Sequence, residues 1–403
     1  MASVFDTLER RGYVEQLTHP EEIKKLFEKE SVPFYIGIDP TADSLHVGHF
    51  ISLMVAAHMQ KAGHKPIILM GGGTAIIGDP SGKTDMRKML TVQDIDNNVA
   101  SIKKQIEKFL SFEGENAAII VNNGDWLRDL NYINFMRDIG VHFSVNRMLA
   151  AECYKNRLET GLTFFELGYM LMQSYDFLYL HDHYGCKLQM GGNDQWSNII
   201  GGVELIRKIG AEDSYGFTFK LLTTKEGKKM GKTEKGALWL NPEKTSPYEF
   251  YQYWRNVADE DIENVMKLLT FIEPDEIEEM TKYKDERINE AKKRAAFEIT
   301  KLVHSEEEAI KAEEATKAVF EGKGNVAAMD STKVEVNASI VDAIVATGIA
   351  SSKGQAKTLI NQGAITLNDN KIEEVSYVLK EEDFADGYAI LRKGKKVYHK
   401  LVK

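Results

Sequence analysis

Cysteine is scarce in this sequence, and long apolar runs are absent from it. The 403 residues contain two cysteines, Cys153 and Cys186, which are too few for a disulfide framework or a four-thiolate zinc site. No run approaches the roughly 18 apolar residues that a membrane span requires. Residues 1–20 mix acidic and basic side chains, which argues against a secretory signal or an Arg-rich transit peptide. We therefore expect a protein of the reducing cytoplasm.

Positive charge is also in short supply over most of the chain. The net charge of −10 argues against attraction of the whole molecule to nucleic acid. Residues 337–403, however, contain ten Lys or Arg against eight Asp or Glu, a net charge of +2 that leaves −12 on the preceding residues. A basic module on an acidic body can still bind RNA locally.

The pattern of residues 31–240 is typical of an α/β domain. Strands are predicted at 34–38 and 66–70, and Ser44 is expected to cap a connecting helix over 45–61. Such a strand–helix–strand unit implies a right-handed crossover and a parallel, Rossmann-like sheet. Further strands are expected at 118–121 and 187–190.

Strand signals fade after residue 245. Charged helical patterns such as 286–303 follow, and the last part combines two helical pieces with short strands at 364–367 and 388–391. We expect an α/β domain, an α-helical domain, a linker and a small α+β domain, at residues 1–245, 246–325, 326–337 and 338–403.

The first motif joins a strand end at Asp39 to a helix start at His46. His46 and His49 are three residues apart and share a face, where backbone N–H groups and the helix dipole favour anions. Gly48 between them lets a flat base or a phosphate approach the backbone. Alone, the pattern is equally compatible with two ordinary histidines or with a zinc pair that takes Asp39 as a third ligand.

Glycines follow the second predicted strand, from Gly71 to Thr84. The carboxyl ends of parallel strands are where open sheets bind ligands. The segment approaches a P-loop, but Ile77 stands where that motif requires glycine, and Asp79-Pro80 would put an acid and a missing N–H inside the phosphate cradle. The acid favours a cationic amine instead.

Three further patterns each leave two interpretations open. An apolar helix over 163–180 carries four polar side chains on one face, those of Glu166, Tyr169, Gln173 and Asp176. They form either a structural hydrogen-bond network or a polar pocket. Residues 191–196 form a plain turn or bind the hydroxyls of a ribose. Residues 225–233 are a solvated lysine hairpin or a mobile loop that closes on a leaving pyrophosphate.

In this order the motifs resemble those of class I aminoacyl-tRNA synthetases, and most closely those of the bacterial-type tyrosyl enzymes. His46–His49 is similar to the HIGH signature and Lys229–Thr233 to the KMSKS signature. The departures are Val47 for isoleucine and Gly231-Lys-Thr for Ser-Lys-Ser. The other matching stretches are Tyr35–His49, Gly78–Lys83, Asn122–Trp126, Tyr169–Phe177 and Gly191–Trp196.

The resemblance implies a role for each matching residue. Those expected to bind tyrosine are Tyr35, Asp79, Asn123, Tyr169, Gln173, Asp176 and Gln195. Those expected around ATP or the adenylate are Asp39, Gly48, Gly192, Asp194 and Lys232. Those expected to act on the phosphates are His46, His49, Lys83, Arg87, Lys229, Lys232 and Thr233. ATP would be a substrate that arrives with Mg²⁺, and no protein-bound metal or organic cofactor is expected.

The resemblance extends to the partners. The first domain would contain a dimer-forming insertion, the helical domain would bind the anticodon region of tRNA(Tyr), and the tail would be an αL-type RNA-binding domain with phosphate contacts from Arg392, Lys393, Lys395 and Lys396. The expected partners are tyrosine, ATP, tRNA(Tyr) and a second copy of the chain, and no membrane.

Three alternatives remain open at this point. A tryptophanyl-tRNA synthetase would not need Tyr35 and Asp176, which suit a phenol. A nucleotidylyltransferase with the same histidine helix would not need an RNA-binding tail. A non-catalytic RNA-binding relative would not need intact His46, His49 and Lys229.

Overall fold

The chain divides into two compact units. The computed structural model describes residues 3–81, 83, 85, 89–211, 213–233, 236–283, 285–320, 329–368, 370–385, 387–394 and 397–403, with the side chains of 232 and 318–320 outside the description. The first unit comprises Met1–Lys232, Ala237–Asn241 and Asp259–Asp285. The second comprises Thr233–Gly236, Pro242–Ala258 and Glu286–Lys403.

A six-stranded sheet forms the centre of the first unit. Its order is β1-β6-β5-β2-β3-β4, and all neighbours are parallel except β1 and β6. The strands are β1 Val14–Leu17, β2 Pro33–Ile38, β3 Lys65–Met70, β4 Ile119–Asn122, β5 Leu188–Gly192 and β6 Tyr215–Phe219. This confirms the predicted α/β fold with a parallel, Rossmann-like sheet.

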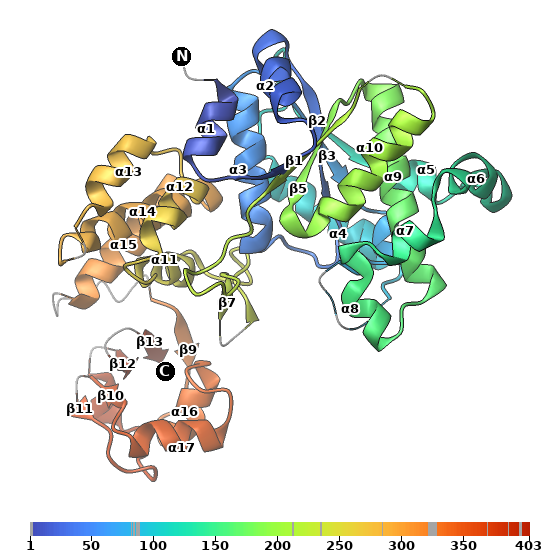
Figure 1. Ribbon diagram of the computed structural model, residues 1–403. Coiled ribbons are helices and arrows are strands. Elements are labelled where there is room, and N and C mark those ends of the chain that lie inside the picture. Colours follow the sequence, from blue (N-terminus) through green and yellow to red (C-terminus); the bar gives the residue numbers. More distant parts are fainter. Residues whose placement is uncertain are drawn as a thin grey trace. The chain divides into compact units, whose positions relative to one another are not determined.

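Helices cover both faces of this sheet (Figure 1). The connection β2–α3–β3 runs toward one edge and β5–α10–β6 toward the other, so the strand order reverses between β2 and β5. Ligands of open α/β sheets bind at such a reversal, beyond the carboxyl ends of the strands.

The helices of the first unit are α1 Val4–Arg10, α2 Pro20–Lys29, α3 Val47–Lys61, α4 Val92–Ile106, α5 Gly124–Leu127, α6 Tyr132–Asp138, α7 Val145–Leu149, α8 Glu152–Thr160, α9 Phe164–Tyr184, α10 Trp196–Lys208, α12 Ile262–Leu269 and α13 Pro274–Thr281, with 3₁₀ turns η1 Thr74–Ile76, η2 Gly140–His142 and η3 Asn193–Gln195.

The predicted start of the first crossover helix is wrong by two residues. α3 begins at Val47, and its N-cap is His46, whose Nδ1 accepts the backbone N–H of Gly48 at 3.0 Å. Ser44 is buried and donates its hydroxyl to the carbonyl of Leu45 at 2.8 Å, so it does not cap the helix. The predicted end of the helix is confirmed by Gly63, at a φ of +96° that favours glycine.

The second unit contains the helices α11 Pro247–Arg255, α14 Ile288–Val303 and α15 Glu306–Phe320 and a small α+β region. The elements of that region are β9 Ser331–Lys333, α16 Ile340–Ala346, α17 Lys353–Asn361, β10 Ile365–Leu367, β11 Asn370–Lys371, η5 Glu381–Phe384, β12 Tyr388–Lys393 and β13 Val397–Val402. The residues of the hairpin β7 Lys232–Thr233 and β8 Gly236–Ala237 are divided between the two units. The last five strands form a sheet of order β11-β10-β12-β13-β9. Its core includes the buried side chains of Ile344, Ile360 and Leu391, so the predicted α+β tail has a core of its own. No helix in the described parts of either unit is long and apolar enough to cross a membrane.

Candidate functional site

A cavity of about 380 Å³ opens where the strand order reverses, at the carboxyl ends of β2 and β5. It brings together most of the predicted site residues, from segments far apart in the sequence. The predicted residues that line it are Tyr35, Asp39, His46, Gly48, His49, Asp79, Lys83, Asn123, Tyr169, Gln173, Asp176, Gly192, Asp194, Gln195 and Lys229. Other polar lining residues, which the sequence patterns did not single out as site residues, are Thr41, Ser52, Thr74, Ser81 and Gln189.

One end of the cavity is closed by a buried carboxylate. Asp176 on α9 is 1% exposed, and its two oxygens accept Asn123 Nδ2 and Trp126 Nε1, each at 2.8 Å. Burial raises the pKa of Asp176 to about 8, although both hydrogen bonds favour the charged form. The buried hydroxyl of Tyr35 lines the same cavity and has no hydrogen-bond partner among the described residues. An unpartnered hydroxyl beside a carboxylate suits a ligand that offers a hydroxyl group.

The raised pKa of Asp176 predicts that stability falls as the pH rises. The ordinary pKa of the group is 3.8, so between about pH 4 and pH 8 the folded chain holds a proton that the unfolded chain has released. Folding is then weakened by up to about 1.4 kcal/mol per pH unit. We therefore expect the thermal unfolding midpoint of the unmodified chain to fall relative to that of Asp176→Asn as the pH rises from 5 to 8. A pH-independent difference between the two would contradict this assignment.

A chain of hydrogen bonds leads from this carboxylate to the other side of the cavity. Asn123 Nδ2 also donates to Thr74 Oγ1 at 3.0 Å, and Thr74 donates to Asp39 Oδ1 at 2.8 Å. The second oxygen of Asp39 accepts the hydroxyl of Tyr169 at 2.9 Å. Burial and the carboxylate of Asp39 raise the pKa of Tyr169 well above its ordinary value, so its hydroxyl remains a donor. The chain fixes the positions of Asp39 and Asp176 relative to each other.

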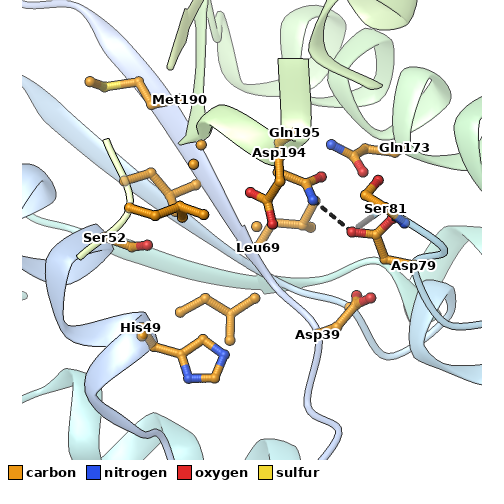
Figure 2. Close-up of a pocket in the computed structure, with 18 of the residues that line it drawn as sticks. Asp39, His49, Ser52, Leu69, Asp79, Ser81, Gln173, Met190, Asp194 and Gln195 are labelled. Atoms are coloured by element: carbon orange, nitrogen blue, oxygen red, sulfur yellow. Dashed lines mark hydrogen bonds between the residues drawn. The ribbon is translucent and has the colours of Figure 1, made fainter. Parts of the chain in front are cut away.

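A second carboxylate, Asp79, lies after η1 in the glycine-rich segment. Its Oδ1 accepts the backbone N–H of Ser81 at 2.9 Å, and its Oδ2 accepts Gln195 Nε2 at 2.6 Å. Figure 2 shows Asp79, Ser81, Gln173 and Gln195 together on one side of the cavity. A carboxylate with a neighbouring amide oxygen from Gln173 suits an ammonium group, as the sequence predicted for this acid.

The two histidines lie at the opposite side of the cavity from Asp79 (Figure 2 labels His49). Their ring centroids are 4.1 Å apart. His46 Nδ1 accepts the N–H of Gly48, and His49 Nδ1 accepts the N–H of His46 at 3.3 Å, so each neutral ring carries its proton on Nε2. Burial lowers the pKa of His46, and the charge of Lys83 lowers it further. His46 therefore offers a neutral Nε2–H donor at the start of α3, where the helix dipole favours anions.

Two lysines extend over the same end of the cavity. Lys83 and Lys229 are exposed and line it. Partial enclosure and the carboxylate of Asp79 raise the pKa of Asp194, and the charges of Lys229 and Lys83 oppose that rise. The two lysines thus act on one carboxylate even though they are 146 residues apart in the sequence.

The structure describes the side chain of only one of the other three predicted phosphate-binding residues, Thr233. Arg87 and the side chain of Lys232 lie outside the described residues. Thr233 lies in β7, where its hydroxyl donates to the carbonyl of Gly236 at 3.1 Å, and it is not among the lining residues.

The two departures from the signature motifs touch each other. A Cβ added at Gly231 would lie 2.8 Å from the Cβ of Val47, and Gly231 has a φ of +81°, which favours glycine. The lysine loop therefore packs closely on the first turn of α3. Within the described residues, no group of three or more His, Cys, Asp or Glu could hold a metal ion.

Comparison with known proteins agrees with this geometry. Residues 28–321 match the family of class I tRNA synthetases for tryptophan and tyrosine, and residues 321–401 match the C-terminal domain of tyrosine–tRNA ligases. The whole chain is 59% identical to the tyrosine–tRNA ligase of Acetivibrio thermocellus, covering 99% of it, and 58% identical to that of Clostridium perfringens over the full length of both. The chain belongs to the tyrosine–tRNA ligase family.

Solved structures of the tyrosine–tRNA ligase family have a similar fold. A C-terminally truncated mitochondrial tyrosyl-tRNA synthetase of Aspergillus nidulans superimposes with a TM-score of 0.72 and 28% identity, over 79% of this chain and 95% of the other. A tryptophanyl-tRNA synthetase of Encephalitozoon cuniculi, at 13% identity and a TM-score of 0.55, shares the fold alone. The predicted enzyme class, an aminoacyl-tRNA synthetase that uses ATP as a substrate, is confirmed, and the tyrosine ligase interpretation is supported over the three alternatives.

Proposed function

We propose that this chain activates tyrosine with ATP in the cavity between Asp176 and His46, and then transfers tyrosine to the 3′ end of tRNA(Tyr). The observation that carries the proposal is the buried pair of Asp176 and Tyr35 at one closed end of a cavity whose other end presents histidine N–H donors and lysines. A hydroxyphenyl group fits the first end and a triphosphate fits the second.

The proposed tyrosine contacts follow from the chemistry of each lining group. The phenolic hydroxyl donates to Asp176 and accepts the hydroxyl of Tyr35, which otherwise stays buried without a partner. Asp79, with Tyr169 and Gln173 beside it, holds the α-ammonium group. Asn123 acts through Asp176, because it donates to that carboxylate at 2.8 Å. Gln195 acts in the same way on Asp79.

The proposed reaction is an in-line displacement at the α-phosphorus of ATP. A carboxylate oxygen of tyrosine attacks, the bond to the bridging oxygen breaks, and pyrophosphate leaves with its electron pair. Asp39, Gly48, Gly192 and Asp194 surround the nucleotide. His46, His49, Lys83 and Lys229 donate to the phosphates as negative charge grows, and Arg87, Lys232 and Thr233 join them in the same role. Such a step requires positioning and charge stabilisation rather than a protein nucleophile. Mg²⁺ enters as MgATP, the form in which the substrate binds.

The second step consumes the adenylate. The terminal ribose hydroxyl of the tRNA attacks the tyrosyl carbonyl, and AMP leaves. We assign the α-helical domain, residues 246–325, to the anticodon region and residues 338–403 to RNA binding, with 326–337 as the linker. In the latter domain α17 begins at a Ser352 cap, and the exposed Lys353 beside it pairs with the exposed Asp342 at 2.6 Å, a surface ion pair that a phosphate can replace.

Tyrosine-dependent exchange of label between pyrophosphate and ATP tests the proposal. We expect exchange with tyrosine and none above background with the other nineteen amino acids. Exchange driven by tryptophan would overturn the tyrosine assignment, and absence of exchange with every amino acid would overturn the enzymatic assignment. Formation of one adenylate per active site in the absence of tRNA provides an independent count of working sites.

We also propose that the protein is a homodimer joined through α6–α9 of the first domain, residues 1–245. Large apolar side chains are exposed there, and such a group on the surface is typical of an interface. The exposed fractions are 60% for Tyr132, 70% for Ile133, 70% for Val141, 57% for Val145 and 71% for Phe164.

Charged substitutions on this surface should separate the two copies. Burial of one such side chain is worth about 2 kcal/mol, and a homodimer loses two of them, so Ile133→Asp and Phe164→Asp should each weaken dimerisation by roughly 10³-fold. Sedimentation over a concentration series measures the effect. Tyr283→Asp, at a side chain that is 43% exposed on another part of the unit, is the matched control and should leave association unchanged. If all three variants had the same dimer dissociation constant, the proposed interface would be wrong.

A reducing cytoplasm completes the proposal. Cys153 and Cys186 are both buried as free thiols. Burial raises the pKa of the Cys153 thiol to about 12, so it stays protonated and unreactive. The proposed fold therefore needs no oxidising compartment.

A further inference from the structure

Behind the carboxylate of Asp79, four residues close a ring of hydrogen bonds, three of them between side chains and one from a backbone N–H. Asp79 accepts the backbone N–H of Ser81 and the Nε2 of Gln195, at 2.9 and 2.6 Å. The amide of Asn198 closes the ring from α10, because its Nδ2 donates to Ser81 Oγ and to Gln195 Oε1, each at 3.2 Å. Figure 2 shows Asp79, Ser81 and Gln195 at the cavity wall, with the bond from Gln195 to Asp79 drawn.

Asn198 completes this ring without reaching the cavity. Its side chain is 1% exposed, and it is not among the lining residues. The amide nitrogen has two hydrogens, and each goes to a different member of the ring. Ser81 is 4% exposed, so it too is shielded from solvent that could replace the bond. Asn198 therefore influences a ligand only through the other members of the ring, whereas Ser81 also lines the cavity.

The ring decides which way the amide of Gln195 points. An amide can turn by 180° and exchange its oxygen and its nitrogen. Because Asn198 donates to Gln195 Oε1, the nitrogen of Gln195 must face Asp79. Without Asn198 only the carboxylate of Asp79 favours this orientation, and the side chain of Gln195 loses the bond that holds its oxygen in place. Asp79 is then held less firmly in one orientation.

We propose that Asn198 and Ser81 are positioning residues for recognition of the substrate's ammonium group. The inference rests on the proposed function, since it assigns Asp79 to that ammonium. Asn198 orients Gln195, Gln195 and the backbone of Ser81 orient Asp79, and Asp79 holds the cation. Loss of Asn198 therefore weakens ligands that carry an ammonium group and leaves ligands without one unaffected.

Three ligands separate this role from a purely structural one. Tyrosine and tyramine carry the ammonium group, whereas 3-(4-hydroxyphenyl)propionate has the same ring and no ammonium. We expect Asn198→Ala to weaken binding of tyrosine and of tyramine by about tenfold, and that of the third ligand by less than twofold. In pyrophosphate exchange, KM for tyrosine should rise by a similar factor and kcat should stay within about threefold. Equal weakening of all three ligands, or no weakening of any, would overturn the inference.

A second variant and a control keep the test independent of stability. Ser81→Ala removes one acceptor of Asn198 but keeps the backbone bond to Asp79, so it should act in the same direction and by less. The double variant should be no worse than Asn198→Ala alone, because both substitutions break one ring. Ser174→Ala is the matched control, since that hydroxyl is buried on α9, within contact range of α10, and has no hydrogen-bond partner among the described residues. It should change binding of none of the ligands.

Failure of the inference can be told apart from failure of the proposed function. If the unmodified chain binds tyrosine and supports exchange but the variants weaken all three ligands alike, only the positioning role is wrong. An unmodified chain that binds neither tyrosine nor tyramine overturns the proposed function and the inference together. If the losses of binding free energy caused by Ser81→Ala and Asn198→Ala add up in the double variant, the two residues act separately and not through one hydrogen-bonded ring.

Discussion

At about pH 9, where the carboxyl group of Asp176 is ionised, its replacement by asparagine should lower kcat/KM for tyrosine in adenylate formation by about 10²- to 10⁴-fold, the loss of one or two hydrogen bonds to a buried charged group. The carboxylate of Asp176 accepts Asn123 and Trp126 on its two oxygens at 2.8 Å. An amide has a single oxygen, so its NH₂ group must face one of these two donors. The substrate's hydroxyl also loses a charged acceptor. Tyrosine-dependent pyrophosphate exchange, with KM and kcat measured separately, checks the prediction.

Asp182→Asn provides the control for this substitution. Asp182 lies on the same helix, and its side chain is 52% exposed, so the same change of charge should leave the kinetics unaltered. Unaltered kinetics in Asp176→Asn as well would remove Asp176 from the tyrosine site.

Replacement of His46 by alanine should lower kcat for adenylate formation by about 10²- to 10³-fold, the usual cost of one donor to developing charge. The pKa of His46 is lowered by burial, so the ring acts as a neutral donor through Nε2. Because that donor meets the phosphates most strongly in the transition state, KM for tyrosine should change little. Single-turnover formation of the adenylate measures the chemical step directly.

One further variant at this position, His46→Asn, separates catalysis from helix capping. His46→Asn keeps an acceptor for the N–H of Gly48, because asparagine is a favoured N-cap residue, but it does not replace the Nε2 donor. We therefore expect His46→Asn to restore stability and not activity. Recovery of activity in His46→Asn would show that the histidine serves only as the cap of α3.

Much of the fold and of the site could be predicted because the decisive signals are local. The apolar runs at 34–38 and 66–70 identify β2 and β3, and the glycines after them identify the edge of the sheet where ligands bind. The spacing of Tyr169, Gln173 and Asp176 on one helix predicts a shared face, and all three line the cavity. These patterns depend on neighbours within one or two turns of the chain.

Other features depend on contacts that no local pattern contains. Trp126 and Asp176 are 50 residues apart, and Ser81 and Asn198 are 117 apart, so their hydrogen bonds exist only after the sheet has formed. The cap of α3 was predicted at Ser44 because serine is the commoner N-cap residue. Histidine takes that position here because its ring nitrogen can accept the N–H of Gly48 while its other nitrogen remains available.

The hydrogen-bond chain from Tyr169 through Asp39, Thr74 and Asn123 to Asp176 has a consequence for redesign of this protein. A substitution that reshapes the end of the cavity at Asp176 also disturbs Asp39, because Asn123 and Thr74 between them already use their side-chain donors within the chain. Attempts to accept larger or differently substituted rings would therefore begin better at Gln189, a lining residue of β5 whose amide oxygen is buried and has no hydrogen-bond partner among the described residues. A change there leaves the chain intact, so the new ring preference and the rate of activation can be adjusted separately.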